Sequence, residues 1–570
     1  MRETTFRRTL GRGLAAGFAA AAFAVLPAAA QEPDQQQPHH HAAGMPTVTE
    51  VGGAVPLYHN LGTLGHKVST GSAAAQRYFD QGLRLTYAFN HEEAIASYTQ
   101  ATREDSTCAM CWWGIAYAMG PNINAPMDTA AYRSAYAAIQ QAVKLSSKGT
   151  PYERDMIQAM AKRYVPEPVA DRAPLDSAYA KAMKGLAKKY PDDPEAQTLY
   201  GESLMNLSPW NYWEGRGTKA RPGTQDVVTT LERTLKKSPN HLGACHFYIH
   251  IVEASTTPGR ALPCADKMAR QIPGEGHLVH MPSHIYMRVG YYDRVVNHNH
   301  DAVAADQAYV QDRKPKGFYQ YMYYPHNWHM LWYGLIQLGR GAETITASRE
   351  LVKVVPVDVV KTAPPLEYFF PAPYWSLVRF GKYDEMLAEP APAEPLKYAT
   401  GMWRYGRGLA FTAKGRLDEA KAELDGVAAV AQATPKEAPA GINSQKTLLS
   451  LAERHLAGKL AIARGDTAAG IAALEQAMKY EDELLYDEPP AWYHPMRQEL
   501  GGLHLAMGHA SVAEKLYRED LAHQPNNGWS LYGLARSLEA QNKGAEAAKV
   551  DAEYRKWWDK ADVKPLAMAK

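Results

Sequence analysis

Eight residues of the kinds that bind metal ions are regularly spaced in the middle of this 570-residue sequence. They are His246, His250, Glu253, His277, His280, His284, His326 and His329. Residues three or four positions apart on a helix project from one face, so each pair of imidazoles can reach one ion. Imidazole suits zinc, copper, iron and nickel. The spacing therefore predicts a transition-metal site.

Copper is the first choice for this metal, with zinc and iron as alternatives, because the ligands are nearly all imidazole and copper heads the affinity order. Seven histidines exceed one tetrahedral site. Two metal ions, or one ion with histidines left for acid–base work, fit the count better, and a binuclear copper centre is one such arrangement. Glu253 is expected to be a ligand or to fix the tautomer of a ligand histidine. The residues do not choose between storage, transport and metal-dependent catalysis.

The elements that must position these residues are recurring helix pairs. A turn followed by an amphipathic helix recurs at residues 89–95, 290–293, 381–384 and 415–420, and again near Gly465 and Gly508. This pattern resembles the tetratricopeptide repeat (TPR), a helix–turn–helix unit of about 34 residues. The resemblance implies an all-α, TPR-like α-solenoid, a superhelix of antiparallel hairpins with more than about 60% helix and almost no strand.

The same repeat gives the histidines a common register. With the turn glycine as position 15, the first helix of each repeat faces the concave side at positions 2, 5, 9 and 12. Three repeats can be aligned in this way, two on Gly290 and Gly339 and one on Ala261 and Pro273. Their concave positions hold seven His, one Glu and one Tyr. Random placement of the 21 His in 570 residues would put about 0.4 His at these positions. Pro282 should interrupt its helix and leave His277 and His280 before the break.

A second resemblance covers most of the chain. Residues 276–286 (GHLVHMPSHIY), 324–329 (YPHNWH) and 526–533 (NNGWSLYG) resemble segments of a group of exported bacterial TPR proteins. The resemblance implies a fold and no particular activity. Two classes of function therefore stay open: a protein that binds a transition metal through the histidines, and a scaffold whose groove holds a peptide or partner protein.

The sequence divides into five segments. Residues 1–30 have a basic start, a short apolar run and a small-residue cleavage motif, which predict a signal peptide and a periplasmic or secreted protein. Residues 31–70 are polar, include three consecutive histidines, and are predicted to form a flexible leader. N-terminal repeats are expected over 71–200, central repeats with the histidines over 201–345, and C-terminal repeats over 346–570.

The charge balance, the apolar runs and the cysteines indicate which kinds of partner and which bonds to expect. The 62 Lys and Arg balance 60 Asp and Glu, and this argues against nucleic-acid binding. After the leader no apolar run is long enough for stable membrane insertion. In an oxidising compartment we expect Cys245 and Cys264 to tie one hairpin together. Cys108 and Cys111 have a spacing shared by redox, metal-binding and accidental pairs.

Overall fold

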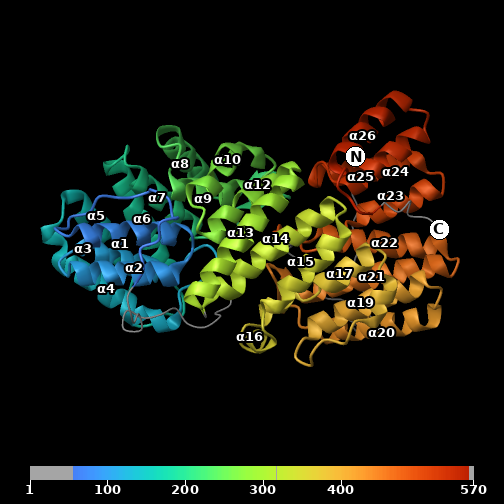
Figure 1. Cartoon of the computed structure of the whole chain (residues 1–570), viewed down its shortest axis with the longest axis horizontal. Helices are drawn as coiled ribbons and strands as arrows, with labels where there is room; N and C mark the ends of the chain where they lie inside the picture. Colours follow the sequence, from blue (N-terminus) through green and yellow to red (C-terminus); the bar gives the residue numbers. More distant parts are fainter. Residues whose placement is uncertain (1–54, 316, 564–570) are drawn as a thin grey trace, which may run out of the picture. The chain divides into compact units, whose positions relative to one another are not determined.

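The computed structural model describes residues 55–315 and 317–563. Along this part of the chain, 26 α-helices follow one another, and the only sheets among the described residues are two pairs of two-residue strands (Figure 1). Consecutive helices pack as hairpins, as in α1 with α2, α19 with α20 and α21 with α22. The prediction of an all-α, TPR-like α-solenoid is confirmed. The predicted signal peptide lies outside the described residues.

The helices of the N-terminal part are α1 (Ala73–Tyr87), α2 (His91–Glu104), α3 (Ala109–Ala118), α4 (Tyr132–Leu145), α5 (Pro151–Met160), α6 (Ala173–Lys189) and α7 (Pro194–Met205). Those of the central part are α8 (Thr224–Lys237), α9 (Leu242–Glu253), α10 (Leu262–Gln271), α11 (Gly276–His280), α12 (Pro282–Val289), α13 (Tyr292–Arg313), α14 (Tyr324–Gln337) and α15 (Gly341–Lys353).

The C-terminal part contains α16 (Val357–Thr362), α17 (Ala372–Arg379), α18 (Tyr383–Ala388), α19 (Lys397–Ala413), α20 (Leu417–Ala433), α21 (Gln445–Ala463), α22 (Thr467–Asp482), α23 (Met496–Ala506), α24 (Ala510–His523), α25 (Gly528–Glu539) and α26 (Gly544–Trp557). The strands are β1 (Trp213–Glu214) with β2 (Lys219–Ala220), and β3 (Pro439–Ala440) with β4 (Asn443–Ser444).

Turn residues and caps explain where many helices begin and end. Gly290 and Gly339, the two glycines that set the central register, have φ of 77° and 67°. That left-handed conformation carries little steric cost only for glycine. Ser72 caps α1 and Asn90 caps α2, each accepting a hydrogen bond from a backbone N–H in the first turn. The predicted break at Pro282 is present, because α11 ends at His280 and α12 begins at Pro282.

One continuous apolar core runs from Leu61 in the N-terminal segment to Met496 at the start of α23. The predicted flexible leader covers residues 31–70, of which 31–54 lie outside the described residues. In its described part, which forms no helix, Leu61 and Val68 are buried in this core. Composition averages over a segment and therefore misses a few buried anchors within it.

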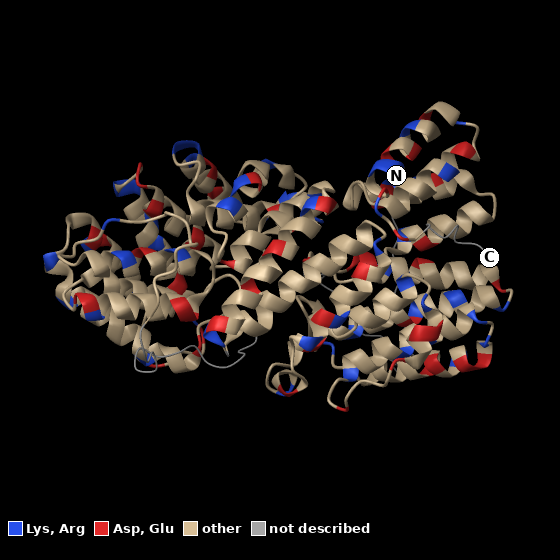
Figure 2. Ribbon diagram, viewed as in Figure 1, with Lys and Arg blue, Asp and Glu red and all other residues tan. Residues whose placement is uncertain are grey.

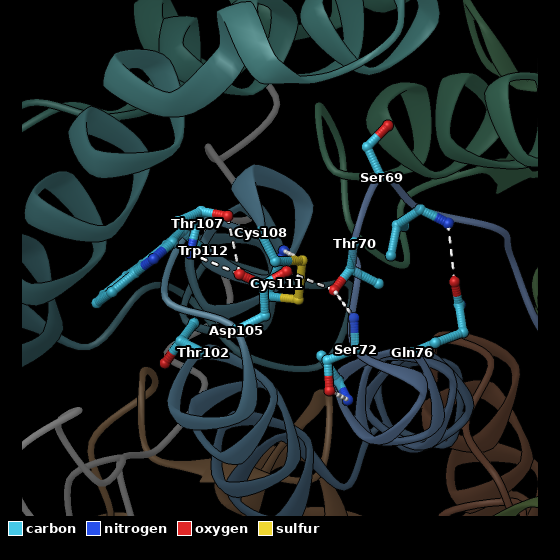
Figure 3. The surroundings of a disulfide bond; sticks show 12 residues. Ser69, Thr70, Ser72, Gln76, Thr102, Asp105, Thr107, Cys108, Cys111 and Trp112 are labelled. Atoms are coloured by element: carbon cyan, nitrogen blue, oxygen red, sulfur yellow. Dashed lines mark hydrogen bonds between the residues drawn. A yellow bond between two sulfur atoms is a disulfide. The ribbon is translucent and has the colours of Figure 1, made fainter.

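Both cysteine pairs are joined as disulfides. Cys245 on α9 is bonded to Cys264 on α10, as expected for one hairpin. The Cys108–Cys111 bond lies at the start of α3, where the Cys108 sulfur also accepts a hydrogen bond from the Cys111 N–H (Figure 3). Both of these sulfurs belong to fully buried residues, so the bond is structural, since reactive cysteines need exposure.

Lys and Arg are interspersed with Asp and Glu along the described helices (Figure 2). Among the described helices, none has the length and apolar composition that a membrane span requires. The expectation that the chain binds no nucleic acid stays a prediction.

Candidate metal centre

Three of the predicted ligands form what we call the first histidine group: His246 and His250 on α9 and His277 on α11. The Nε2 atom of His246 lies 3.1 Å from Nε2 of His250 and 3.2 Å from Nε2 of His277. Tetrahedral ligands at 2.0–2.1 Å from zinc are spaced by roughly 3.3 Å. His246 therefore already has the separation from each of the other two histidines that one ion requires, and all three ligand atoms lie within 4.8 Å of one another.

The other ring nitrogens fix which tautomers are present. Nδ1 of His246 donates a hydrogen bond to the Tyr87 carbonyl at 2.6 Å, and Nδ1 of His250 donates to Glu253 Oε1 at 2.7 Å. Since each Nδ1 carries the hydrogen, the two Nε2 atoms present lone pairs to each other. His277 Nδ1 has no hydrogen-bond partner among the described residues. A cation between these nitrogens would remove the repulsion, and oxygen acceptors at Nδ1 are typical of metal-bound histidines.

The second histidine group consists of His280 on α11, His284 on α12 and His326 on α14. Nε2 of His280 lies 2.6 Å from Nε2 of His284. Nδ1 of His280 donates a hydrogen bond to Oδ1 of Asn299. The amide nitrogen of Asn299 donates to Ser283 and to a backbone carbonyl, and these bonds fix which end of the amide faces His280. His280 therefore offers a lone pair at Nε2, and a proton on His284 fits between the two nitrogens. Because the ligands of one metal ion are roughly 3.3 Å apart, the two rings would have to move apart to bind one.

Glu253 joins the two groups. Its Oε1 accepts from His250 in the first group, and its Oε2 accepts from His284 in the second group at 2.7 Å. Tyr486 also donates its hydroxyl to Oε2 at 2.9 Å. The carboxylate is fully buried, yet His284 and its other hydrogen-bond donors overcome the cost of burial and hold its pKa well below the usual range. In this arrangement Glu253 orients His250 and His284, one candidate ligand from each group.

Glu488 is a member of the site that the sequence did not identify. It follows α22 and hydrogen-bonds Nδ1 of His284 from 204 positions further along the chain. Burial and the nearby Glu253 raise the pKa of Glu488, whereas both carboxylates raise the pKa of His284 to about 10 against the effect of burial. No local spacing could reveal this contact, because only the fold brings the loop before α23 to α12.

His329 lies outside both groups. Its ring packs against Trp332, Tyr368 and Phe369, with ring centroids 5.1–5.4 Å apart. Burial lowers its pKa to about 3, and its Nδ1 has no partner among the described residues. Three positions on a helix turn a side chain by about 60° from the starting direction. Thus α14 directs His326 into the second group and His329 into an aromatic pocket.

The histidine groups are enclosed, whereas the repeat register predicts a cluster along an open groove. His246, His250, His277, His280 and His284 are at most 2% exposed. His326 and Glu488 are partly exposed, so solvent approaches the second group first. Burial and neighbouring histidines lower the pKa values of His246, His277, His280 and His326, which keeps these four imidazoles neutral and ready to bind a metal.

Two strained aromatic residues close the first group. Phe89 has φ of 58° and Trp210 has φ of 61°, both in the left-handed region that bulky side chains avoid at a cost of about 1–2 kcal/mol. The Phe89 ring lies 4.5 Å from the His246 ring and is stacked on His277, and the Trp210 ring meets His250 edge-on at 5.2 Å. Strain of this kind is frequently found at functional sites.

Comparison with known proteins adds little to this geometry. No protein-family model and no curated protein matches the chain. Solved structures similar to it include the human IFIT1 dimer with m7Gppp-AAAA, with 10% identity, a TM-score of 0.35 and coverage of 86% of this chain and 91% of that chain. The APC/C hetero-tetramer Cut9–Hcn1 has 12% identity, a TM-score of 0.29 and coverage of 81% and 76%.

Proposed function

We propose that this chain is an exported TPR-like solenoid that binds two transition-metal ions, one in each histidine group, with copper as the preferred metal and zinc or iron as alternatives. The observation that carries the proposal is the pairing of nitrogens. Nδ1 of His246, His250 and His280 is committed to an oxygen acceptor, and their Nε2 lone pairs converge within 3.2 Å on neighbouring histidines. An all-imidazole set with this second layer of acceptors suits copper.

The alternative of a scaffold that holds a peptide or partner protein uses the same fold. The histidine groups themselves do not favour it, because a peptide could not reach five of their six histidines, which are at most 2% exposed, with only His326 partly exposed. A partner would have to bind elsewhere on the solenoid. We therefore assign the histidines to metal and leave partner binding as a separate property of the repeats.

The test is metal stoichiometry in paired variants of the full chain. Protein freed of metal by a chelator would be dialysed against copper, and bound copper would be counted per chain. His246→Ala with His250→Ala, and His280→Ala with His284→Ala, should each remove one ion relative to the wild type. Exposed His300 on α13 provides the control, because His300→Ala should change nothing.

Circular dichroism would show whether a variant that loses copper is still folded. Both double variants should retain their helical content, since the stability of a solenoid is distributed over many repeats. Folded double variants with full copper content would refute the proposal. Copper that remains in one double variant but not the other would confine the site to a single group.

A further inference from the structure

A separate set of buried metal-binding side chains lies in the C-terminal part of the chain. It consists of His455 on α21, His494 just before α23, and Glu499 on α23, which we call the C-terminal cluster. Their candidate ligand atoms all lie within 4.8 Å of one another. His455 and Glu499 are at most 4% exposed and His494 is 8% exposed. None of these residues belongs to the two histidine groups.

Two imidazole nitrogens that lie near Glu499 in this cluster have no hydrogen-bond partner among the described residues. Nε2 of His455 and Nε2 of His494 are both buried and unpaired among the described residues. Nδ1 of His455 instead pairs with the Tyr405 hydroxyl at 2.8 Å, and that hydroxyl lies 3.1 Å from the hydroxyl of Tyr493. Buried polar atoms are rarely left unpaired, so two such nitrogens directed at one carboxylate indicate a missing ligand.

Glu499 presents one oxygen to these nitrogens. Its Oε1 is bound by the Lys459 ammonium at 2.5 Å, and its Oε2 lies 3.4 Å from Nε2 of His494 and 4.0 Å from Nε2 of His455. Ligands of one tetrahedral zinc ion are roughly 3.3 Å apart, so only a small contraction would be needed. Lys459 and Arg379 are the cations that act on this cluster, and both oppose a bound cation.

We propose that His455, His494 and Glu499 bind one divalent first-row transition-metal ion, independently of the two histidine groups. Two imidazoles with one carboxylate form a mixed nitrogen and oxygen set that suits zinc, cobalt or iron(II) and leaves positions open for water. The positive charge of Lys459 makes this a weaker site than one with a free carboxylate. The alternative without metal is a purely structural Lys459–Glu499 ion pair beside two buried histidines.

Cobalt(II) binding to the metal-free full chain separates these alternatives, because cobalt reports its ligands by visible absorption and can be counted. His494→Ala and Glu499→Gln should each remove one cobalt ion per chain. Lys459→Met should tighten the binding of that ion by at least about tenfold, since it removes a neighbouring positive charge. An ion pair without metal predicts the opposite for Lys459→Met: no gain in cobalt affinity and a less stable fold.

Controls distinguish this site from the histidine groups. His280→Ala with His284→Ala should keep the cobalt ion that His494→Ala removes, whatever happens to copper. The partly exposed pair His504 and His509 gives a matched control, and replacing both by Ala should leave cobalt binding unchanged. Unchanged stoichiometry in folded His494→Ala and Glu499→Gln, or no tightening in folded Lys459→Met, would overturn the proposal even if the histidine groups bind copper.

Discussion

The central repeats and the C-terminal repeats are built from the same hairpin with a turn glycine, but the space around that glycine differs between the two regions. Gly415 and Gly465 in the C-terminal part have φ of 73° and 89°, and no atom lies within 4 Å of where a side chain would begin. At the central turns, a side chain on Gly290 would begin 2.3 Å from the Pro525 carbonyl oxygen, and one on Gly339 would begin 2.3 Å from the Trp558 ring. In the N-terminal part, the turn before α2 contains Phe89, whose ring covers the first histidine group. The helices α19 to α22 are each 16–19 residues long, whereas α11 and α12 have 5 and 8 residues.

The candidate metal-binding residues lie where the helices are least regular. In the C-terminal hairpins α19–α20 and α21–α22 the turns serve packing, so small turn residues and long helices suffice, and His455 on α21 is the one member of the C-terminal cluster that these hairpins carry. In the central part a proline divides a helix, an aromatic residue is strained, and buried polar side chains replace apolar ones. Buried polar groups stabilise a fold only when they are paired. The central repeats should therefore depend on a ligand in a way that the last hairpin, α25 with α26, does not.

Copper should protect the central helices from hydrogen exchange far more than the terminal hairpin. With free copper at about 1,000 times Kd, binding stabilises the native state by roughly 4 kcal/mol. We expect exchange to slow strongly in α9, α11, α12 and α14, with little change in α25 and α26. The measurement is mass-spectrometric hydrogen exchange with and without copper. Equal protection of all helices would contradict this division of the molecule.

The two histidine groups should respond differently to pH. Burial is the main cause that lowers the pKa values of His246 and His277, so the first group is neutral at pH 7. Despite burial, the carboxylates of Glu488 and Glu253 raise the pKa of His284 to about 10, so the metal-free second group holds a proton that copper must displace. Copper affinity should rise about tenfold per pH unit between pH 7 and 9 at the second group only.

The free energy of unfolding of the metal-free chain should also depend on the proton that His284 holds. His284 titrates at about 10 in the folded chain and near 6.5 when unfolded. The stabilisation from its protonated form is therefore complete below about pH 6.5 and is lost as pH rises through 10. Denaturation of the metal-free chain at a series of pH values should show this loss, and Glu488→Gln should reduce it. A flat profile would mean that His284 is neutral.

Much of the fold and part of the site could be predicted from the sequence. The turn glycines and the histidine spacing identify helices α9, α11, α12 and α14 and six of the histidines that the structure brings together. The spacing also grouped His329 with the other histidines, but the structure does not bring it to them. The position of a residue on a helix face does not determine which neighbouring side chains it contacts. The spacing missed Glu488, which reaches His284 only through packing of distant segments, and the C-terminal cluster, in which packing brings His455 to His494 and Glu499.

Phe89→Gly tests whether the strained turn serves the site. Glycine adopts the left-handed conformation freely, so the backbone should relax while the ring that covers His246 and His277 is lost. We expect copper to leave the first group about tenfold faster, which corresponds to roughly 1.4 kcal/mol. Stopped-flow transfer of copper to a chelator measures this rate. If the rate is unchanged, the strain at Phe89 has no part in holding the metal.

Gly415→Ala makes the complementary change in a C-terminal turn. With φ of 73° and open space around it, the added methyl group meets no neighbour and costs only the backbone strain, about 1–2 kcal/mol. The loss should appear as faster hydrogen exchange in α19 and α20, which flank the turn, because a solenoid repeat contacts mainly its neighbours. Copper release should stay at the wild-type rate. A change in copper release would show that the C-terminal turns and the histidine groups are coupled, and the two regions could then not be treated as independent.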